Sequence, residues 1–274
     1  NSYNTDEIFK LYTAIKTENN TKYYVGQHGN NYFTSRINFP RIEDQTADKL
    51  LTWGWKKLPK YLPTFIFKTV GKSNNYDTKG RLLLVEKSHE QRVETWDTST
   101  EYIEYFKDQK KFVNSLADEP KQKLLIRLSS SRINLKLNEN SRWLDFNKML
   151  KIDNGKAPIQ KLFLESRLVV HSYDSTGMLE TFSQNIPTLA FWQNNFDHLR
   201  EKVRPDYQML VDAGIVHLSA ESVANKVSEI WNTVDEWWSQ SNVQQAKNEF
   251  CDIYARKCEN PVNKIASILI EKDI

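Results

Sequence analysis

Residues 168–192 decide the fold of this chain, and their sequence is LVVHSYDSTGMLETFSQNIPTLAFW. An apolar run from Leu168 to Val170 ends in a group of small polar residues, and a short amphipathic helix follows. A second apolar run then extends from Thr188 to Trp192. This order of strand, loop, helix and strand is typical of a parallel α/β sheet.

The small polar residues between the first strand and the helix are the first candidates for a binding site. They are Ser172, Asp174, Ser175, Thr176 and Gly177. A helix N-terminus offers backbone N–H groups and a positive dipole end, which suit an anion such as a diphosphate. Ligands of open α/β sheets also lie beyond the carboxyl ends of the strands. The alternative is an ordinary helix cap, since Ser, Thr and Asp begin most helices without binding a ligand.

The same alternation of elements continues on both sides of this stretch. Further strands are expected at 22–26, 81–86, 123–128 and 215–218, and helices at 6–16, 99–116, 158–167 and 219–231. The polar segment from Gly71 to Gly80 is the best linker in the chain. We therefore predict a doubly wound parallel sheet, with helices on both faces, from about residue 78 onward.

Composition excludes several classes of protein. The chain has 274 residues and a net charge of only +3, which gives little reason to expect nucleic-acid binding. No apolar run approaches the roughly 20 residues of a membrane span, so we expect at most peripheral contact with a membrane. The sequence has no Asp-x-Asp motif and no His or Cys pair at zinc-ligand spacing. We therefore expect no metal or other cofactor.

Three further residues carry a possible chemical role. His28 ends an expected strand next to a glycine, where it suits a general base or a phosphate donor; the alternative is a loop histidine that bonds its neighbours. Arg127 lies within an apolar strand, where it either binds phosphate or forms a structural salt bridge. Glu180, one turn into the helix, either accepts from ribose hydroxyls or is simply solvated.

Seven short segments, taken in chain order, resemble a known protein family. They are Tyr24 to Gly29, Leu51 to Trp55, Ser172 to Glu180, Asn185 to Thr188, Ala213 to His217, Trp237-Trp238 and Phe250-Cys251. Together they resemble the transferase family found in O-antigen and surface-polysaccharide gene clusters of bacteria. More distantly, Gln-His-Gly followed by an Asp-Ser-Thr loop is similar to teichoic-acid glycerophosphotransferases, and capsular Kdo transferases share the same two-lobed plan.

The resemblance implies a GT-B-like fold, in which two Rossmann-like lobes face each other across a cleft. Because members of the family are longer than this chain, it implies that an N-terminal lobe is missing. Residues 1–72 would be the end of that acceptor-side lobe, and residues 78–274 the nucleotide-donor-binding lobe. One departure is Asn30-Asn31 after Gln-His-Gly, where the family tends to have more glycine.

The resemblance also implies an activity. We expect a metal-independent glycosyltransferase that moves a sugar from a nucleotide-sugar donor to a growing surface polysaccharide, on a glycan or glycolipid acceptor. The loop from Ser172 to Gly177 and Arg127 would hold the donor phosphates, Glu180 the ribose, and His28 would be catalytic. A side chain at Gly177 would then obstruct the phosphate.

Two alternatives to this activity stay open. One is a polyol-phosphate transferase that uses a CDP-alditol donor, and the other is a non-catalytic nucleotide- or carbohydrate-binding protein of the same fold. We expect a cytoplasmic location, at the inner face of the inner membrane if the protein contacts a membrane.

Overall fold

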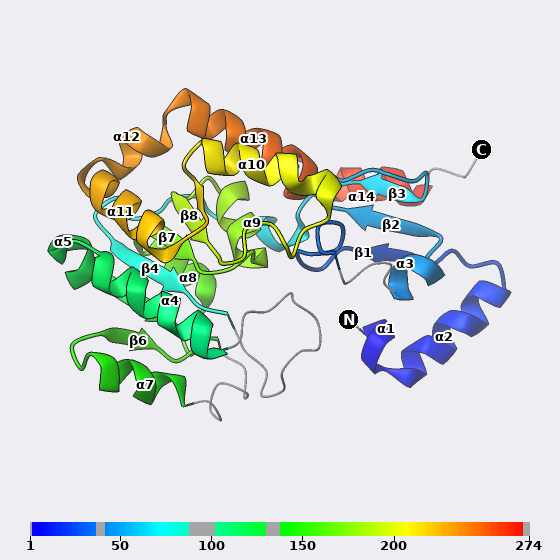
Figure 1. Cartoon of the computed structure of the whole chain (residues 1–274). Helices are drawn as coiled ribbons and strands as arrows, with labels where there is room; N and C mark the ends of the chain where they lie inside the picture. Colours follow the sequence, from blue (N-terminus) through cyan, green and yellow to red (C-terminus); the bar gives the residue numbers. More distant parts are fainter. Residues whose placement is uncertain (1, 37–41, 88–101, 130–137, 271–274) are drawn as a thin grey trace.

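The computed structural model describes residues 2–36, 42–87, 102–129 and 138–270 (Figure 1). Its strands form two separate sheets, one of three strands and one of six, and every strand pair within them is parallel. The two sheets lie at opposite ends of the molecule, with the N-terminal helices beside the small one (Figure 1). The predicted class, α/β with a GT-B-like pair of parallel-sheet units, is confirmed.

The large sheet has the strand order β6-β5-β4-β7-β8-β9. Its strands are β4 (Arg81–Val85), β5 (Leu124–Arg127), β6 (Lys151–Asp153), β7 (Ser166–His171), β8 (Thr188–Phe191) and β9 (Val216–His217). The first strand is central, and the chain reverses its direction of winding between β4 and β7. This is the doubly wound dinucleotide-fold order, in which ligands bind at the point of reversal.

Helices cover both faces of the large sheet. They are α4 (Tyr102–Ser115), α5 (Asp118–Gln122), α7 (Glu139–Phe146), α8 (Ile159–Leu164), α9 (Thr176–Ser183), α10 (Arg204–Asp212), α11 (Ala220–Ile230), α12 (Val234–Trp238) and α13 (Ser241–Tyr254). Short 3₁₀ turns, Glu201–Val203 and Trp231–Thr233, precede α10 and α12.

The two faces are separated by the alternation of side chains along each strand. Leu82 and Leu84 share one hydrophobic cluster with Phe112 of α4. Leu83, between them, belongs to a second cluster with Phe163 of α8. Strands that are buried on both faces are continuous apolar runs, which is why β4 reads Arg-Leu-Leu-Leu-Val.

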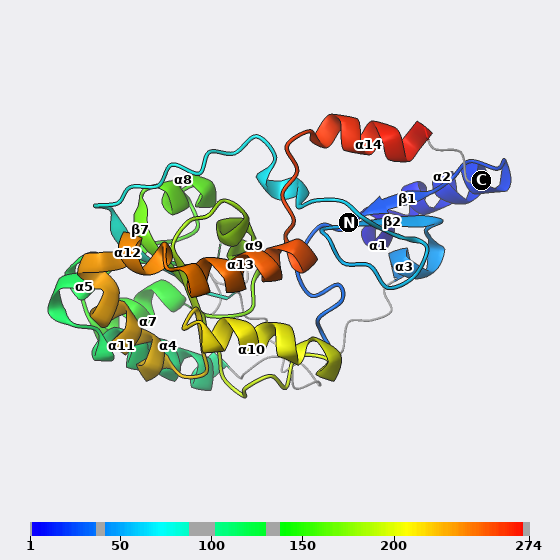
Figure 2. The ribbon, with the colours of Figure 1, turned by 90° about the horizontal axis from the view of Figure 1, so that it is seen from above.

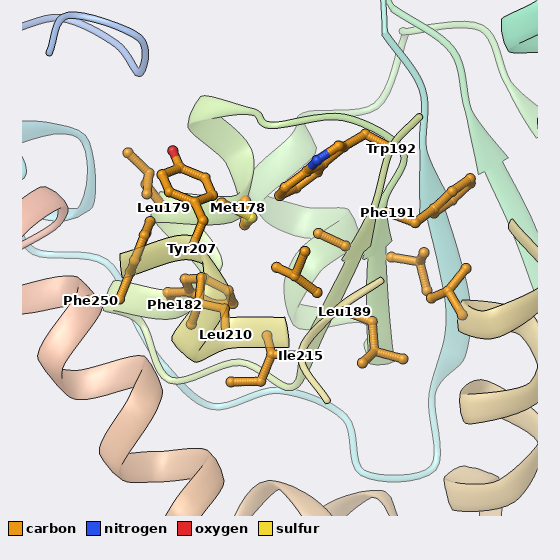
Figure 3. Close-up of a cluster of buried hydrophobic side chains, with 14 of the residues drawn as sticks. Met178, Leu179, Phe182, Leu189, Phe191, Trp192, Tyr207, Leu210, Ile215 and Phe250 are labelled. Atoms are coloured by element: carbon orange, nitrogen blue, oxygen red, sulfur yellow. The ribbon is translucent and has the colours of Figure 1, made fainter. Parts of the chain in front are cut away.

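Packing of α9 fixes the direction of the candidate loop. Met178 and Phe182 point from α9 into a buried cluster with residues of α10 and α13 (Figure 3). Phe250 makes an edge-to-face contact with Phe182, with ring centroids 6.2 Å apart, and another with Tyr207 at 5.1 Å. Aromatic pairs of this geometry add to the hydrophobic stabilisation. The N-terminus of α9 is therefore held rigidly at the carboxyl edge of the sheet.

The small sheet has the order β1-β2-β3. Its strands are β1 (Tyr24–Gly26), β2 (Lys49–Thr52) and β3 (Tyr61–Pro63), and its helical elements are α1 (Ser2–Thr5), α2 (Glu7–Glu18), α3 (Ile42–Thr46) and the 3₁₀ turn η1 (Phe67–Thr69). A stacked pair, Phe33 and Trp55, lies in its core with ring centroids 3.7 Å apart.

The C-terminal segment returns to the small sheet. The N–H of Arg256 donates to the Trp53 carbonyl at 2.8 Å, and the N–H of Ile66 donates to the Arg256 carbonyl at 2.9 Å. After this segment, helix α14 (Pro261–Ile270) lies in the small-sheet half of the molecule (Figures 1 and 2). Residues 256–270 thus lie outside the large-sheet unit, whereas the sequence assigns all of 78–274 to it. Within the described ranges, no helix is long and apolar enough to span a bilayer.

Candidate functional site

The start of α9 lies where a ligand site of this topology is expected. The loop follows β7, beside the reversal between β4 and β7. Ser175 is the N-cap, and its Oγ accepts from the N–H of Met178 at 2.9 Å. The cap leaves the N–H groups of Thr176 and Gly177 without a partner inside the helix. These two groups, at the positive end of the helix dipole, suit an anion.

The hydroxyl of Ser175 is also committed to a buried histidine. Ser175 Oγ lies 3.1 Å from His171 Nδ1, and Thr181 Oγ1 lies 3.4 Å from Nε2 of the same ring. Burial lowers the pKa of His171 to about 3, so the ring is neutral near pH 7. His171 therefore orients the cap and adds no positive charge to the site. For Ser175 the structure shows the helix cap that the sequence left open as an alternative.

Ser172 follows β7 and bonds to the end of β4, the two strands on either side of the reversal. Its N–H and its Oγ both donate to the carbonyl of Val85, at 3.1 Å and 2.9 Å. Its Oγ also lies 2.5 Å from the hydroxyl of Tyr105. The side chain is 3% exposed. Ser172 thus lies at the predicted place, but its hydroxyl is held by protein groups.

Asp174 links the large-sheet unit to the small-sheet unit by hydrogen bonds. Its Oδ1 accepts from Asn30 Nδ2 at 2.7 Å, and its Oδ2 accepts from the Tyr207 hydroxyl at 2.9 Å. His198 Nε2 lies 3.4 Å from Oδ2. Both carboxylate oxygens are engaged, and a carboxylate would repel a phosphate. The described contacts of Asp174 thus hold the loop in place, and its phosphate contact stays a prediction.

The segment that contains His28 packs against the start of α9. The N–H of Asn30 donates to Thr176 Oγ1 at 2.9 Å. A Cβ placed on Gly29 would lie only 3.2 Å from that same oxygen, so the glycine permits the close approach. Gln27 anchors the other end, since its Oε1 accepts from the N–H of Trp53 at 3.0 Å. The structure therefore brings the strand-end loop of the small sheet onto the loop of the large sheet.

His28 itself is exposed to solvent at this junction. Its Nδ1 forms a short hydrogen bond with the hydroxyl of Tyr32. The two rings are nearly perpendicular, at 85°, with centroids 5.2 Å apart. An exposed imidazole is suited to accept or donate a proton.

Arg127 and Glu180 are engaged elsewhere. Arg127 forms a short ion pair with Asp153 of β6 and donates to the Ala157 carbonyl at 2.7 Å. This is the structural salt bridge that the sequence left open. Glu180 is buried and lies 3.5 Å from Lys68 and 3.4 Å from Lys72, on the segment that leaves the small sheet. It is therefore not the solvated first-turn residue considered as an alternative.

The expected role of Gly177 needs correction. A Cβ at this position would lie 2.9 Å from Cε1 of His171 and 3.5 Å from Cζ of Phe163. The side that would carry a side chain thus faces the sheet, and a substitution would clash with His171 before it met a phosphate. The glycine permits close packing of helix on strand, which is one of the known uses of glycine in phosphate-binding turns.

A pair of buried carboxyl groups near the reversal was not predicted. Glu86 follows β4 directly, and its Oε2 accepts from Trp143 Nε1 at 3.2 Å. Burial raises the pKa of Glu86 to about 8 and that of Glu139 to about 7. The only sequence signal was a charged residue immediately after a buried strand.

Across the described ranges, no three His, Cys, Asp or Glu residues are grouped to hold a metal, and metal independence stays a prediction.

Comparisons with known proteins place the chain among transferases. The model of the LIC12162 family transferase matches residues 1–269. Among curated proteins, no match was found. The resemblance that the seven sequence segments predict is thereby confirmed at the level of a transferase family, and the expectation of a transferase is confirmed with it.

Solved structures show more distant similarity. The wall teichoic acid polymerase TagF is 14% identical, with 92% of this chain and 66% of that one covered and a TM-score of 0.49. The spinosyn forosaminyltransferase SpnP is 10% identical over 84% of this chain and 57% of that one, with a TM-score of 0.46. A UDP-N-acetylglucosamine 2-epimerase of Listeria monocytogenes is 14% identical over 86% and 64%, with a TM-score of 0.47. The chain thus spans about two thirds or less of these proteins' length.

Proposed function

We propose a function from the premise that this chain belongs to the LIC12162 family of transferases. The proposed reaction moves a sugar from a nucleotide-sugar donor to a glycan or glycolipid acceptor of a growing surface polysaccharide, without a metal. It belongs to the complete enzyme, with the N-terminal lobe in place, and a cytoplasmic location is part of the same proposal.

One observation supports the proposal above all others, namely the contact between residues 27–30 and the start of α9. The contact lies at the reversal of the large sheet and brings the N–H groups of Thr176 and Gly177, which have no partner inside helix α9, beside the loop of His28. A leaving nucleotide diphosphate needs its charge stabilised as the sugar departs. Preorganised N–H donors and a helix dipole supply that stabilisation where other enzymes use a cation.

His28 has two possible tasks in this reaction. It either removes the proton from the acceptor hydroxyl, or it donates to a donor phosphate. Its exposure favours the first task, because a general base must reach the hydroxyl of an incoming acceptor. Asp174 and Ser172 then hold the loop from behind, through the contacts to Asn30, Tyr207 and Val85.

A panel of donors tests the proposal. The chain is first screened for thermal stabilisation by CMP, CDP, UDP and GDP, since a ligand that binds the folded state raises the melting temperature. The full-length protein is then incubated with the matching nucleotide sugars and, separately, with CDP-glycerol. We expect stabilisation by one nucleoside diphosphate and sugar transfer from its conjugate. Transfer from CDP-glycerol alone would identify a polyol-phosphate transferase, and the absence of any nucleotide binding would reject both enzymes.

A further inference from the structure

Asn30 of the small-sheet unit bonds to the candidate loop of the large-sheet unit through two groups at once. Its backbone N–H donates to Thr176 Oγ1 at 2.9 Å, and its side-chain Nδ2 donates to Asp174 Oδ1 at 2.7 Å. The two acceptors lie on either side of Ser175, the residue that caps α9. The Asn30 side chain is buried, which shields its bond from competing water. One residue therefore sets both the distance and the direction between the two loops.

The turn that presents Asn30 is held by its own unit. Gln27 Nε2 donates to the Gly29 carbonyl at 3.0 Å, and Gln27 Oε1 accepts from the N–H of Trp53 at 3.0 Å. Asn31 adopts a left-handed backbone conformation, with φ 68°, which asparagine tolerates better than most residues with a side chain. The small-sheet side of the contact is therefore fixed in position.

The acceptor on the large-sheet side is fixed as well. Asp174 is buried, and its other oxygen, Oδ2, accepts from the hydroxyl of Tyr207 on α10 at 2.9 Å. His198 Nε2 lies 3.4 Å from the same oxygen. The carboxyl group of Asp174 thus connects Asn30 to α10, one oxygen to each. Buried polar networks whose members all have partners hold a single arrangement.

The side chain of Asn30 is what distinguishes this contact from one made by backbone alone. The sequence has Asn30-Asn31 where the resemblance leads us to expect more glycine. A glycine at position 30 would keep the N–H that bonds Thr176, but it has no side chain to reach Asp174. The amide side chain therefore adds the second bond between the two units.

We propose that Asn30 is a positioning residue, which holds the loop of His28 at a fixed separation from the turn that binds the donor phosphates. The role in the reaction rests on the proposed function above, whereas the contact itself does not depend on it. Asn30 acts on His28 through the backbone of residues 28–30, and on α9 through Asp174 and Thr176. A displacement of about 1 Å between reacting groups lowers the rate steeply, so a fixed separation contributes to kcat.

The chain contains a matched control at the other end of α9. Ser183, the last residue of the helix, donates from its Oγ to Thr69 Oγ1 at 3.0 Å. Thr69 ends the 3₁₀ turn η1 of the small-sheet unit. A Thr69→Val variant thus removes a hydroxyl contact between the same two units without touching the loop of His28. It controls for a general loosening of one unit against the other.

Amide hydrogen exchange followed by ¹⁵N NMR tests the contact without any substrate. Asn30→Ala removes the side-chain donor, and Asn30→Asp sets two carboxyl groups against each other. We expect the backbone amide at position 30 to exchange about tenfold faster in both variants, after correction for the intrinsic rate of the new residue. Combining Asn30→Asp with Asp174→Asn restores an amide opposite a carboxyl group, and this variant should return to within about threefold of the wild-type rate.

Thr69→Val should exchange at the wild-type rate at position 30. Circular dichroism monitors folding, and two single variants are used so that one folding failure does not decide the result. Unchanged exchange in a folded Asn30→Ala or Asn30→Asp protein would overturn the inference. So would a double variant that exchanges as fast as Asn30→Asp alone, because the effect would then not belong to the bond with Asp174.

Steady-state kinetics of the full-length protein tests the role in the reaction. Asn30→Ala should lower kcat about 10- to 100-fold and leave the donor KM within about threefold, because the cap of α9 is intact while the base is displaced. Thr69→Val should keep the wild-type kcat. Faster exchange with an unchanged kcat, or an equal loss of kcat in Thr69→Val, would contradict the positioning role. If the wild type transfers no sugar, the proposed function fails, and the exchange rates still decide whether Asn30 holds the two loops together.

Discussion

At the scale of single residues, most polar side chains of the candidate loop are held by the protein. Ser172, Asp174 and Ser175 each direct their oxygen atoms to partners inside the fold. In the proposed site, we therefore expect a donor to contact the backbone N–H groups at the start of α9 and the exposed His28. Fixed backbone donors lose no rotamer freedom on binding, which makes them good anion ligands.

Replacing His28 tests its catalytic role. His28→Gln should lower kcat by about 10²- to 10⁴-fold, the range of general acid–base contributions. The donor KM should change little, because in the proposed site the phosphates contact α9 and not His28. Steady-state kinetics with the donor found in the panel gives both values. The control is His217→Gln, since His217 lies on β9 and bonds Ser222 Oγ at 2.8 Å. A kcat for His28→Gln within a few-fold of that control would remove His28 from the mechanism.

The sequence predicted the place of these residues better than their partners. The loop after a buried strand and the histidine after a short strand are local patterns, and both lie where they were expected. The partner of Arg127, by contrast, is Asp153 on a neighbouring strand, and nothing local in the sequence links the two. The hydrogen bond between Tyr32 and Glu43 carried no local signal either, because only the folded chain brings the two residues together.

At the scale of elements, the long apolar runs were predicted, and some of the short strands were not. Strands β4, β5, β7 and β8 coincide with predicted runs, since two-sided burial demands continuous apolar residues. Strands β3 and β6 have three residues each and were missed. The helix expected at 158–167 ends at Leu164, because Ser166 already belongs to β7. The expected helix at 99–116 begins outside the described residues, which resume with α4 at Tyr102.

Two helix caps in this chain allow an effect on stability to be distinguished from an effect on nucleotide binding. Ser175 caps α9 and Ser219 caps α11, each through a side chain that accepts from a first-turn N–H. Alanine at either position should lower the free energy of unfolding by about 1 kcal/mol. Only Ser175→Ala should also weaken nucleotide binding, by several-fold, because it loosens the turn that presents Thr176 and Gly177. Urea unfolding measures the free energy of unfolding, and calorimetric titration measures the nucleotide affinity. Equal nucleotide affinity in both variants would place the donor away from α9.

At the scale of the whole molecule, buried ionisable groups couple folding to pH. Burial raises the pKa of Glu86 to about 8 and lowers that of His171 to about 3. The folded state thus keeps a proton on Glu86 that the unfolded state releases. At His171 the folded state does not bind a proton that the unfolded state takes up. Stability therefore falls on both sides of a maximum in the mildly acidic range.

The alkaline side of this profile is predicted to depend on Glu86. Between pH 4.5, the ordinary value for Glu, and about 8, the folded state binds the extra proton. The free energy of unfolding should then fall with rising pH by up to about 1.4 kcal/mol per pH unit for this one group. Glu86→Gln should flatten that slope, whereas the exposed Glu249→Gln should not. Urea unfolding at several pH values measures it, and an unchanged slope in Glu86→Gln would assign the dependence to other groups.

The strand order of the large sheet is the global feature that the sequence did not supply. A parallel sheet with helices on both faces followed from the alternation of elements. The reversal between β4 and β7 depends on which strands pair, and β4 pairs with β7 across a long stretch of intervening chain. The return of the chain from Tyr254 to the small sheet is also set by long-range contacts, such as those of Arg256 with Trp53 and Ile66.

The most direct test of a donor site at α9 is a nucleotide titration followed by backbone amide NMR. The ¹⁵N-labelled chain is titrated with the nucleoside diphosphate that stabilises it, and every assigned amide is followed. The largest shifts should fall on Thr176 and Gly177, where N–H groups meet the diphosphate. The amides of Ala220 and Glu221, at the equivalent turn of α11, should stay in place. Saturation with nucleotide that leaves Thr176 and Gly177 unmoved would contradict the donor site proposed here.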